Sequence, residues 1–300
     1  MVNFPAIIVD TLGQRLRAEL LEQFPKADSD LQLALGTATR MTIERIARSD
    51  ALYHNVEHTI LVTLVGLEIL RGRNMREGID AEDWVHFVVA LLCHDVGYVR
   101  GVCRDDTSSQ FVIDEEGTKL EAPRGASDAW LTPYHVTRGK IFVTERCGAI
   151  GAVDPARIAK AIELTRFPVP QDGDHDDVTG EPGLVRAADL IGQMADPNYP
   201  KKHNALFYEF VETGTADILG YKNPADLSDG YPTFFWSCVE PYVGKAIELL
   251  EETQQGRTWV AQLYAHVFSI QHRRNRMGPQ RAQTTAGGGE TPALQKPPLG

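Results

Sequence analysis

Two histidines four residues apart give this chain its first chemical signal, in the segment 53–58 (YHNVEH). On a helix, His54 and His58 would lie on one face. The apolar residues that continue this face are Leu61, Val62, Val65 and Ile69. Imidazoles at the start of a buried helix are costly unless they are hydrogen-bonded or bind a metal ion. The segment therefore predicts either a metal site or a surface histidine beside a hydrogen-bonded core histidine.

A neighbouring histidine and aspartate, His94 and Asp95, close the apolar segment 87–93. Where a helix ends, two adjacent side chains can both reach one cation, and Gly97 then lets the chain turn away. Without a partner, the carboxylate of Asp95 would be a buried and strongly destabilising charge. A single His-Asp dipeptide often arises by chance, so its weight comes from its place at the end of a buried helix.

Asp189 lies in a third apolar segment, among the small residues of 185–193 (VRAADLIGQ). In such a helix an aspartate is either a polar contact between helices or a metal ligand. Together the three segments offer imidazole nitrogens and carboxylate oxygens. This set suits one or two divalent ions of Mn, Fe, Zn, Ni or Mg, and it does not suit a copper or thiolate site.

Helical periodicity dominates the segments that must position these side chains. Apolar residues recur at spacings of three and four over 8–23, 31–48, 54–72, 81–93, 127–148, 154–165, 183–194, 200–219, 233–252 and 256–272. The stretch 100–125 breaks the pattern and contains a candidate hairpin at 112–117, while 168–182 is an acidic loop. We therefore expect an all-α fold, with a single domain over 1–273 and a disordered tail over 274–300.

Charge and composition exclude several classes of partner. The 300 residues carry a net charge of −11, so the chain should repel long nucleic acid while still accepting a small phosphorylated compound. The longest apolar stretch, 60–70, contains Glu68 and is too short to cross a bilayer. The four cysteines form no CxxC pair. We expect a cytoplasmic protein without a membrane partner, and assembly into a homo-oligomer stays open.

The order His…His-Asp…Asp on helices resembles the HD-domain superfamily of metal-dependent phosphohydrolases. The segment 53–58 is similar to the opening motif of the class I cyclic-nucleotide phosphodiesterases, and Ala188–Gly192 (ADLIG) resembles the last metal-ligand helix of bacterial HD proteins. The resemblance covers about 50–195 and implies a helical HD bundle over that range. The remaining helices would then be additions at the N- and C-terminal ends.

This resemblance implies a role for each matching residue. His58, His94, Asp95 and Asp189 would bind the first metal ion, and Asp95 could bridge to a second ion and so belong to the catalytic machinery. His54 matches the phosphodiesterase position that protonates the leaving oxygen. The adjacent Asn55 would orient the loop or contact substrate and water.

The chain departs from the phosphodiesterase pattern at Tyr98, where those enzymes carry a further histidine. His135, within an H-x-x-x-G segment, resembles a ligand of the HD subclass that hydrolyses cyclic dinucleotides, although a helix-surface histidine is the structural alternative. That subclass also has histidines that this chain lacks near 163–168, where Glu163 could serve as a carboxylate ligand. His175 is expected to be a solvated residue of the acidic loop.

Arginines are the candidate phosphate ligands, because a guanidinium matches phosphate oxygens in a bidentate fork. The candidates are Arg124, Arg138, Arg166 and Arg186. Each is more often a surface or ion-pair residue. We select Arg138 and Arg186 as substrate-binding residues, and Arg186 in particular because it lies three residues before Asp189 on one helix face.

The function expected from these features is hydrolysis of a phosphoester, by metal-activated water, in a nucleotide or other small phosphorylated compound. Two alternatives from other classes stay open. One is an HD-type mixed-valent di-iron oxygenase, which requires six protein ligands, with Glu163 as the last available. The other is a non-catalytic HD domain that senses a ligand. An intact ligand set argues against the latter.

Overall fold

The computed structural model describes residues 3–276, and these form an almost wholly helical protein. The all-α class expected from the sequence is confirmed. The α-helices are α1 (Phe4–Gln23), α2 (Ser29–Ile46), α3 (Val56–Arg76), α4 (Ala81–Cys93), α5 (His135–Arg146), α6 (Pro155–Glu163), α7 (Glu181–Met194), α8 (Tyr199–Glu212), α9 (Thr215–Leu219), α10 (Pro224–Phe234), α11 (Glu240–Leu250) and α12 (Gln254–Arg276). The expected tail at 274–300 lies outside the described residues, except that 274–276 complete α12.

Helix α3 is central to the bundle and packs against α4, α7, α11 and α12. Its Val62 and Val65 are fully buried, as the apolar stripe predicts. Helix α7 approaches it most closely at Gly192, where an added Cβ would lie only 2.6 Å from the Cα of Val62. Because any side chain there would force the helices apart, this glycine permits the approach that brings α7 and its Asp189 against α3.

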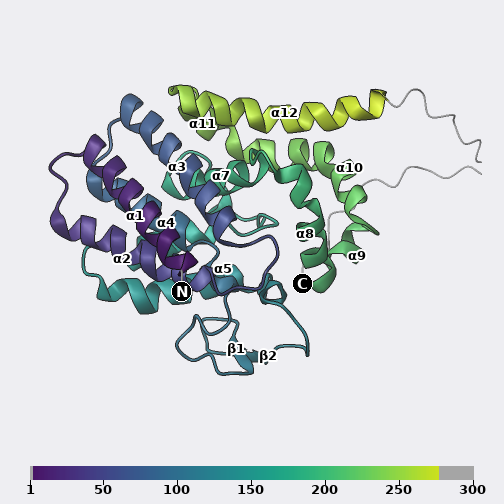
Figure 1. Ribbon diagram of the computed structural model, residues 1–300, viewed down its shortest axis with the longest axis horizontal. Coiled ribbons are helices and arrows are strands. Elements are labelled where there is room, and N and C mark those ends of the chain that lie inside the picture. Colours follow the sequence, from purple (N-terminus) through teal and green to yellow (C-terminus); the bar gives the residue numbers. More distant parts are fainter. Residues whose placement is uncertain (1–2, 277–300) are drawn as a thin grey trace, which may run out of the picture.

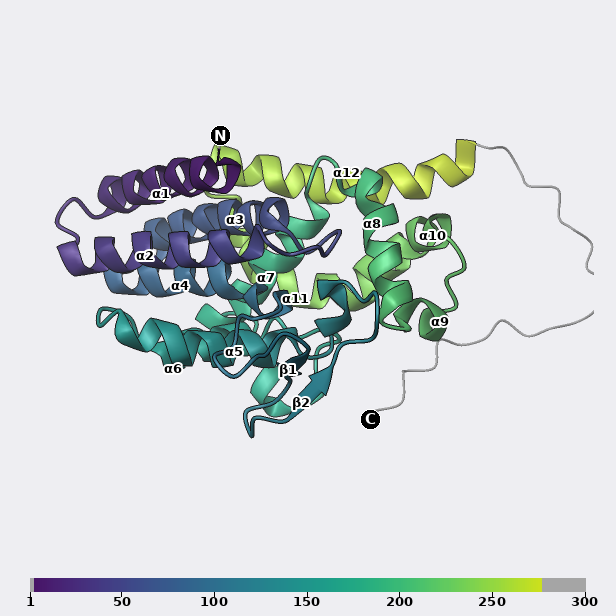
Figure 2. The same cartoon turned by 60° about the horizontal axis from the view of Figure 1, so that its bottom comes forward.

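The helices form layers along the long axis of the molecule (Figures 1 and 2). Helices α1 and α2 pack together, α2 packs on α4, and α4 packs on α6. At the opposite end of the molecule, α8, α9 and α10 form a smaller group, and α12 runs along one edge. No helix within residues 3–276 combines the length and apolar character needed to cross a membrane.

Two short strands form the hairpin expected in the stretch that breaks the helical pattern. Strand β1 (Gln110–Val112) pairs antiparallel with β2 (Lys119–Glu121). The hairpin projects from the helical body near α5 (Figure 1). The long connection between α4 and α5 is therefore folded, and it covers one side of the bundle.

Some boundaries differ from the expected ones. The segment 200–219 forms two helices because Gly214 adopts a positive φ of 75°, which ends the helical path between α8 and α9. The segment 233–252 is likewise divided, since a π-turn over Phe235–Val239 separates α10 from α11. Most important for the site, α3 begins at Val56, so His54 does not lie on that helix.

Candidate metal centre

Four side chains predicted as ligands meet where three helices converge. His58 lies in the first turn of α3, His94 and Asp95 directly follow α4, and Asp189 lies within α7. The Nε2 atom of His58 is 3.2 Å from Asp95 Oδ2 and 3.3 Å from Asp189 Oδ1. The Nε2 atom of His94 is 3.2 Å and 3.5 Å from the same two oxygens. Donor atoms from three helices thus surround one point.

The donor set fits a cation in burial and in chemistry. His58, His94 and Asp95 are buried and lie close enough together to hold a metal ion. Asp95 Oδ2 is buried and accepts no hydrogen bond from the part of the chain that the structure describes. A buried carboxylate oxygen without a donor is costly, and a bound cation would neutralise it. Asp189 is 20% exposed, which leaves one side of the site open.

Backbone carbonyls fix the tautomers of two histidines at the site. His94 Nδ1 lies 2.7 Å from the carbonyl oxygen of Leu91, and His135 Nδ1 lies 2.6 Å from that of Thr132. Since a carbonyl can only accept, each Nδ1 carries the proton. In the neutral form of each ring, Nε2 therefore carries the lone pair, which is the arrangement typical of metal-binding histidines.

His135 lies at the edge of the centre, as the first residue of α5. Its Nε2 is 3.9 Å from Asp95 Oδ1, the oxygen that does not face His58 and His94. Burial lowers the pKa of His135 to about 4, so its imidazole is neutral at pH 7. His135 and Asp95 could thus share a second cation beside the first.

Without a metal ion, the neighbouring charges of the cluster shift the pKa values of its histidines and aspartates. Burial opposes charge on His58, but Asp189 and Asp95 outweigh it and raise its pKa to about 9. Burial likewise opposes charge on Asp95, whose pKa the adjacent imidazoles of His94 and His58 hold well below its usual range. In the metal-free chain, protons on the histidines supply the positive charge that the two carboxylates require.

Metal affinity should therefore rise with pH. At pH 7 His58, with a pKa of about 9, carries a proton that must leave before Nε2 can bind a cation. We expect affinity to increase about tenfold per pH unit for each proton released, up to about pH 9. The stability of the metal-free fold should change in the opposite direction and fall as pH rises. The raised pKa stabilises the fold below the ordinary value of 6.5, and this contribution is lost as pH rises through 9.

Titration calorimetry with Mn²⁺ between pH 6 and 9 measures the affinity. Repeating it in two buffers of different ionisation enthalpy gives the number of protons released. Melting of the metal-free protein over the same range measures its stability. An affinity that does not change with pH would contradict the expected release.

His54 lies in the loop before α3 and is held by a residue that the sequence analysis missed. Its Nδ1 is 2.6 Å from Glu209 Oε2 on α8, and Glu209 Oε1 accepts the backbone N–H of Tyr53 at 2.6 Å. Glu209 is 3% exposed. Burial opposes its ionisation, but His54 and these N–H groups lower its pKa. In the sequence, Glu209 could have been noticed only as a carboxylate within the otherwise apolar run 205–211.

Asn55 serves as the N-cap of α3. Its Oδ1 accepts the backbone N–H of Glu57 at 2.9 Å and that of His58 at 3.3 Å, and its Nδ2 donates to the carbonyl of Leu52. These contacts agree with the expected role of Asn55 in orienting the loop, and its substrate-binding role stays a prediction. Because the cap fixes the first turn of α3, it fixes the backbone that carries His58.

The two arginines selected as substrate ligands are structural anchors. Arg138 is fully buried, and it donates to Asp106 and to the carbonyls of Gly97, Val99 and Val112. It thereby ties the hairpin connection to α5. Arg186 is 2% exposed and donates to the carbonyls of His175 and Asp177. These contacts favour structural roles, and the substrate-binding roles of Arg138 and Arg186 stay predictions.

Glu163, the remaining predicted metal ligand, is engaged by two cations. Its two oxygens bind Arg166 Nε at 2.6 Å and Lys140 Nζ at 2.9 Å. Burial opposes ionisation, but these two cations outweigh it and lower the pKa of Glu163 to about 2. His175, expected to be solvated, is buried, and its Nδ1 lies 2.6 Å from Asp172. The acidic loop therefore packs on the bundle through His175, and Glu163 belongs to a surface ion network.

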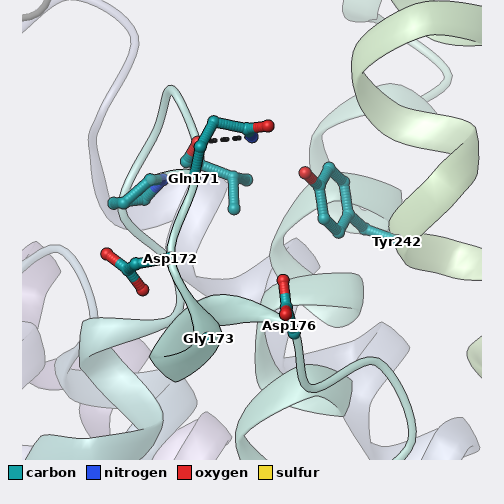
Figure 3. Close-up of a pocket in the computed structure, with 7 residues that line it drawn as sticks. Gln171, Asp172, Gly173, Asp176 and Tyr242 are labelled. Atoms are coloured by element: carbon teal, nitrogen blue, oxygen red, sulfur yellow. Dashed lines mark hydrogen bonds between the residues drawn. The ribbon is translucent and has the colours of Figure 1, made fainter.

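A pocket of about 400 Å³ lies on that loop, away from the residues of the metal centre. Figure 3 shows Tyr242 of α11 facing Gln171 and Asp176 across it. No His58, His94, Asp95 or Asp189 atom lines this pocket. Arg186 lies beneath Tyr242, with its guanidinium carbon 4.3 Å from the ring centre. The pocket is thus a feature of the loop and does not belong to the candidate centre.

No curated protein matches this chain by sequence. One family model does match, and it covers residues 2–273. The matched range includes the helices at both ends as well as the segment that carries the four candidate ligands, so these helices are part of what the family shares. The chain belongs to the Npun_R2479-like family.

Proposed function

We propose that this protein is a metal-dependent phosphohydrolase of the HD type, acting on a phosphoester in a nucleotide or other small compound. One observation carries the proposal. The Nε2 atoms of His58 and His94 each lie 3.2 Å from the buried Asp95 Oδ2, and they lie 3.3 Å and 3.5 Å from Asp189 Oδ1. The sequence order of these residues is the order that the HD resemblance implies.

Different residues of the chain would bind the cation and protonate the leaving group. When bound, a divalent cation polarises a phosphoryl oxygen and lowers the pKa of a coordinated water. His58, His94, Asp95 and Asp189 would hold it, and His135 with Asp95 would hold a second. His54 donates a proton from Nε2 to the leaving oxygen, because its Nδ1 is occupied by Glu209. Glu209 orients the ring.

The contacts of Glu163 bear on the oxygenase alternative. That alternative requires a sixth ligand, for which the sequence offers Glu163. Both oxygens of Glu163 are engaged by Arg166 and Lys140, which leaves five candidate ligands and more positions for water and substrate. This supports hydrolysis over oxygen activation. The unpartnered oxygen of Asp95 similarly supports a metal-binding enzyme over a domain that only senses a ligand.

We expect the purified protein to contain at least one equivalent of a divalent transition metal and to hydrolyse phosphoesters. Elemental analysis gives the metal. Turnover of bis(4-nitrophenyl) phosphate and 4-nitrophenyl phosphate tests diester and monoester substrates. Chelation should abolish turnover, and Mn²⁺, Zn²⁺ or Fe²⁺ should restore it. A protein that contains no metal and rebinds none would refute the centre, and a metal-loaded protein that consumes O₂ would favour the oxygenase.

A further inference from the structure

A tyrosine ring separates two histidines at the rim of the centre. Tyr98 stacks on His54 with a centroid distance of 4.4 Å and an interplanar angle of 13°. It also stacks on His135 at 4.4 Å and 23°. Tyr98 is 2% exposed, whereas the side chains of His54 and His135 are 16% and 13% exposed. The three rings therefore form one stack, with the phenol inside and an imidazole on each face.

The chain builds this stack from three separate segments. Tyr98 ends the 3₁₀ turn Val96–Tyr98 that directly follows Asp95. That turn reaches α5 because Gly97 has no side chain, since a Cβ there would lie 1.9 Å from the carbonyl oxygen of His135. The close approach places Tyr98 against the His135 ring.

A hydrogen bond at Nδ1 anchors each outer imidazole. His54 Nδ1 is held by Glu209, and His135 Nδ1 is held by the carbonyl of Thr132. Each histidine is thus fixed at one nitrogen and by one ring face. With Nδ1 engaged, only Nε2 of each ring is available for chemistry. Tyr98 keeps the two rings from contacting each other directly.

We infer that Tyr98 is a positioning residue that sets the separation and parallel orientation of His54 and His135. The inference rests on the proposed function for what these histidines do. In an in-line displacement the leaving oxygen departs on the side opposite the attacking oxygen. The proton donor and the second cation ligand must therefore stand at a fixed distance from each other. The ring face of Tyr98 offers neither imidazole a hydrogen bond. It therefore keeps the proton donor, His54, apart from the cation ligand, His135.

Two variants of Tyr98 test the role of the ring. Tyr98→Phe keeps the aromatic faces and should retain turnover within a few-fold. Tyr98→Leu removes them and should lower kcat by about 10²-fold, the effect of misplacing a reacting group by about 1 Å, with KM changing less. The tighter cation site should remain, because the hydrogen bond from Tyr98 to Asp95 joins backbone atoms, which both variants keep. Binding of the second Mn²⁺ should weaken about tenfold, since His135 loses its support.

Imidazole proton resonances give a readout that does not depend on activity. In the wild-type protein the ring current of Tyr98 should shift the His54 and His135 signals upfield, and Tyr98→Phe should preserve this shift. Tyr98→Leu, or Tyr98→Met if the leucine variant does not fold, should abolish it. Tyr231→Leu is the matched control, because Tyr231 is also 2% exposed but lies on α10. That control should retain the shifts, both metal sites and kcat.

The outcomes separate this inference from the proposed function. Unshifted histidine signals in the wild-type protein, or a Tyr98→Leu variant with wild-type kcat and two intact metal sites, would overturn the role of Tyr98. If the wild-type protein hydrolyses no phosphoester, the proposed function fails, while the resonances and the second Mn²⁺ affinity still decide whether Tyr98 positions the two histidines. If Tyr98→Phe keeps both the shifted histidine resonances and the second Mn²⁺ affinity, the positioning role of Tyr98 is supported.

Discussion

His54→Ala should lower turnover by about 10²–10⁴-fold while the metal content stays unchanged. His54 is paired with Glu209 through Nδ1, and it lies in the loop before α3. His58, His94, Asp95 and Asp189 already supply four ligands, and a fifth would occupy a position needed by water or substrate. Elemental analysis and steady-state turnover on the same preparation measure the two effects.

An exposed histidine provides the control for this substitution. His272→Ala should change neither quantity, because His272 lies on the exposed face of α12. Loss of metal in His54→Ala would make His54 a ligand and refute its role as proton donor. Full turnover with full metal content would make His54 structural, and the proton would then have to come from another group.

Asp95→Ala should abolish metal binding and remove the effect of a chelator on melting. The carboxylate lies 3.2 Å from the Nε2 atoms of both His58 and His94, so its loss leaves Asp189 as the one carboxylate beside these two buried imidazoles. Removal of one partner from a buried charged pair costs about 3–5 kcal/mol. For a chain of this size, that corresponds to a fall in Tm of about 10 °C.

Thermal melting with and without chelator tests this expectation, with Asp174→Ala as the exposed-aspartate control. Asp174 lies at the surface of the acidic loop, so its removal should leave both Tm and the chelator effect as in the wild type. If Asp95→Ala melts like the metal-loaded wild type and still responds to chelator, Asp95 is not a ligand.

Local patterns in the sequence were enough to predict the helices and the convergence of the ligands. The run that ends at Cys93 is apolar on all sides, so its burial followed directly, and α4 has the expected bounds of Ala81–Cys93. The start of α3 was misplaced, although Asn55 carries a recognisable capping side chain. The helical spacing of His54 and His58 was given more weight than the cap, and for that reason His54 was assigned to the helix.

Contacts between distant segments could not be predicted from local patterns. Arg138 and Arg186 have the chemistry of phosphate ligands, and only the fold shows that loop carbonyls occupy their donors. Glu209 lies 155 residues from His54 in sequence, beyond the reach of any spacing rule. His175 appeared solvent-exposed because its neighbours are acidic, yet a contact with Asp172 and the packing of the loop bury it.

Helix α8 has a consequence for how this protein can be divided. Its Glu209 holds the loop of His54, and its Glu212 accepts the backbone N–H and the hydroxyl of Ser127 at 2.5 Å each, just before the turn that leads to His135. A fragment cut after Asp189 would keep every candidate ligand of the first metal ion but lose both of these carboxylates. The smallest unit that keeps the whole candidate centre must therefore extend through α8. Residues 50–195 alone would carry the four candidate ligands without the two carboxylates that hold the loop of His54 and Ser127.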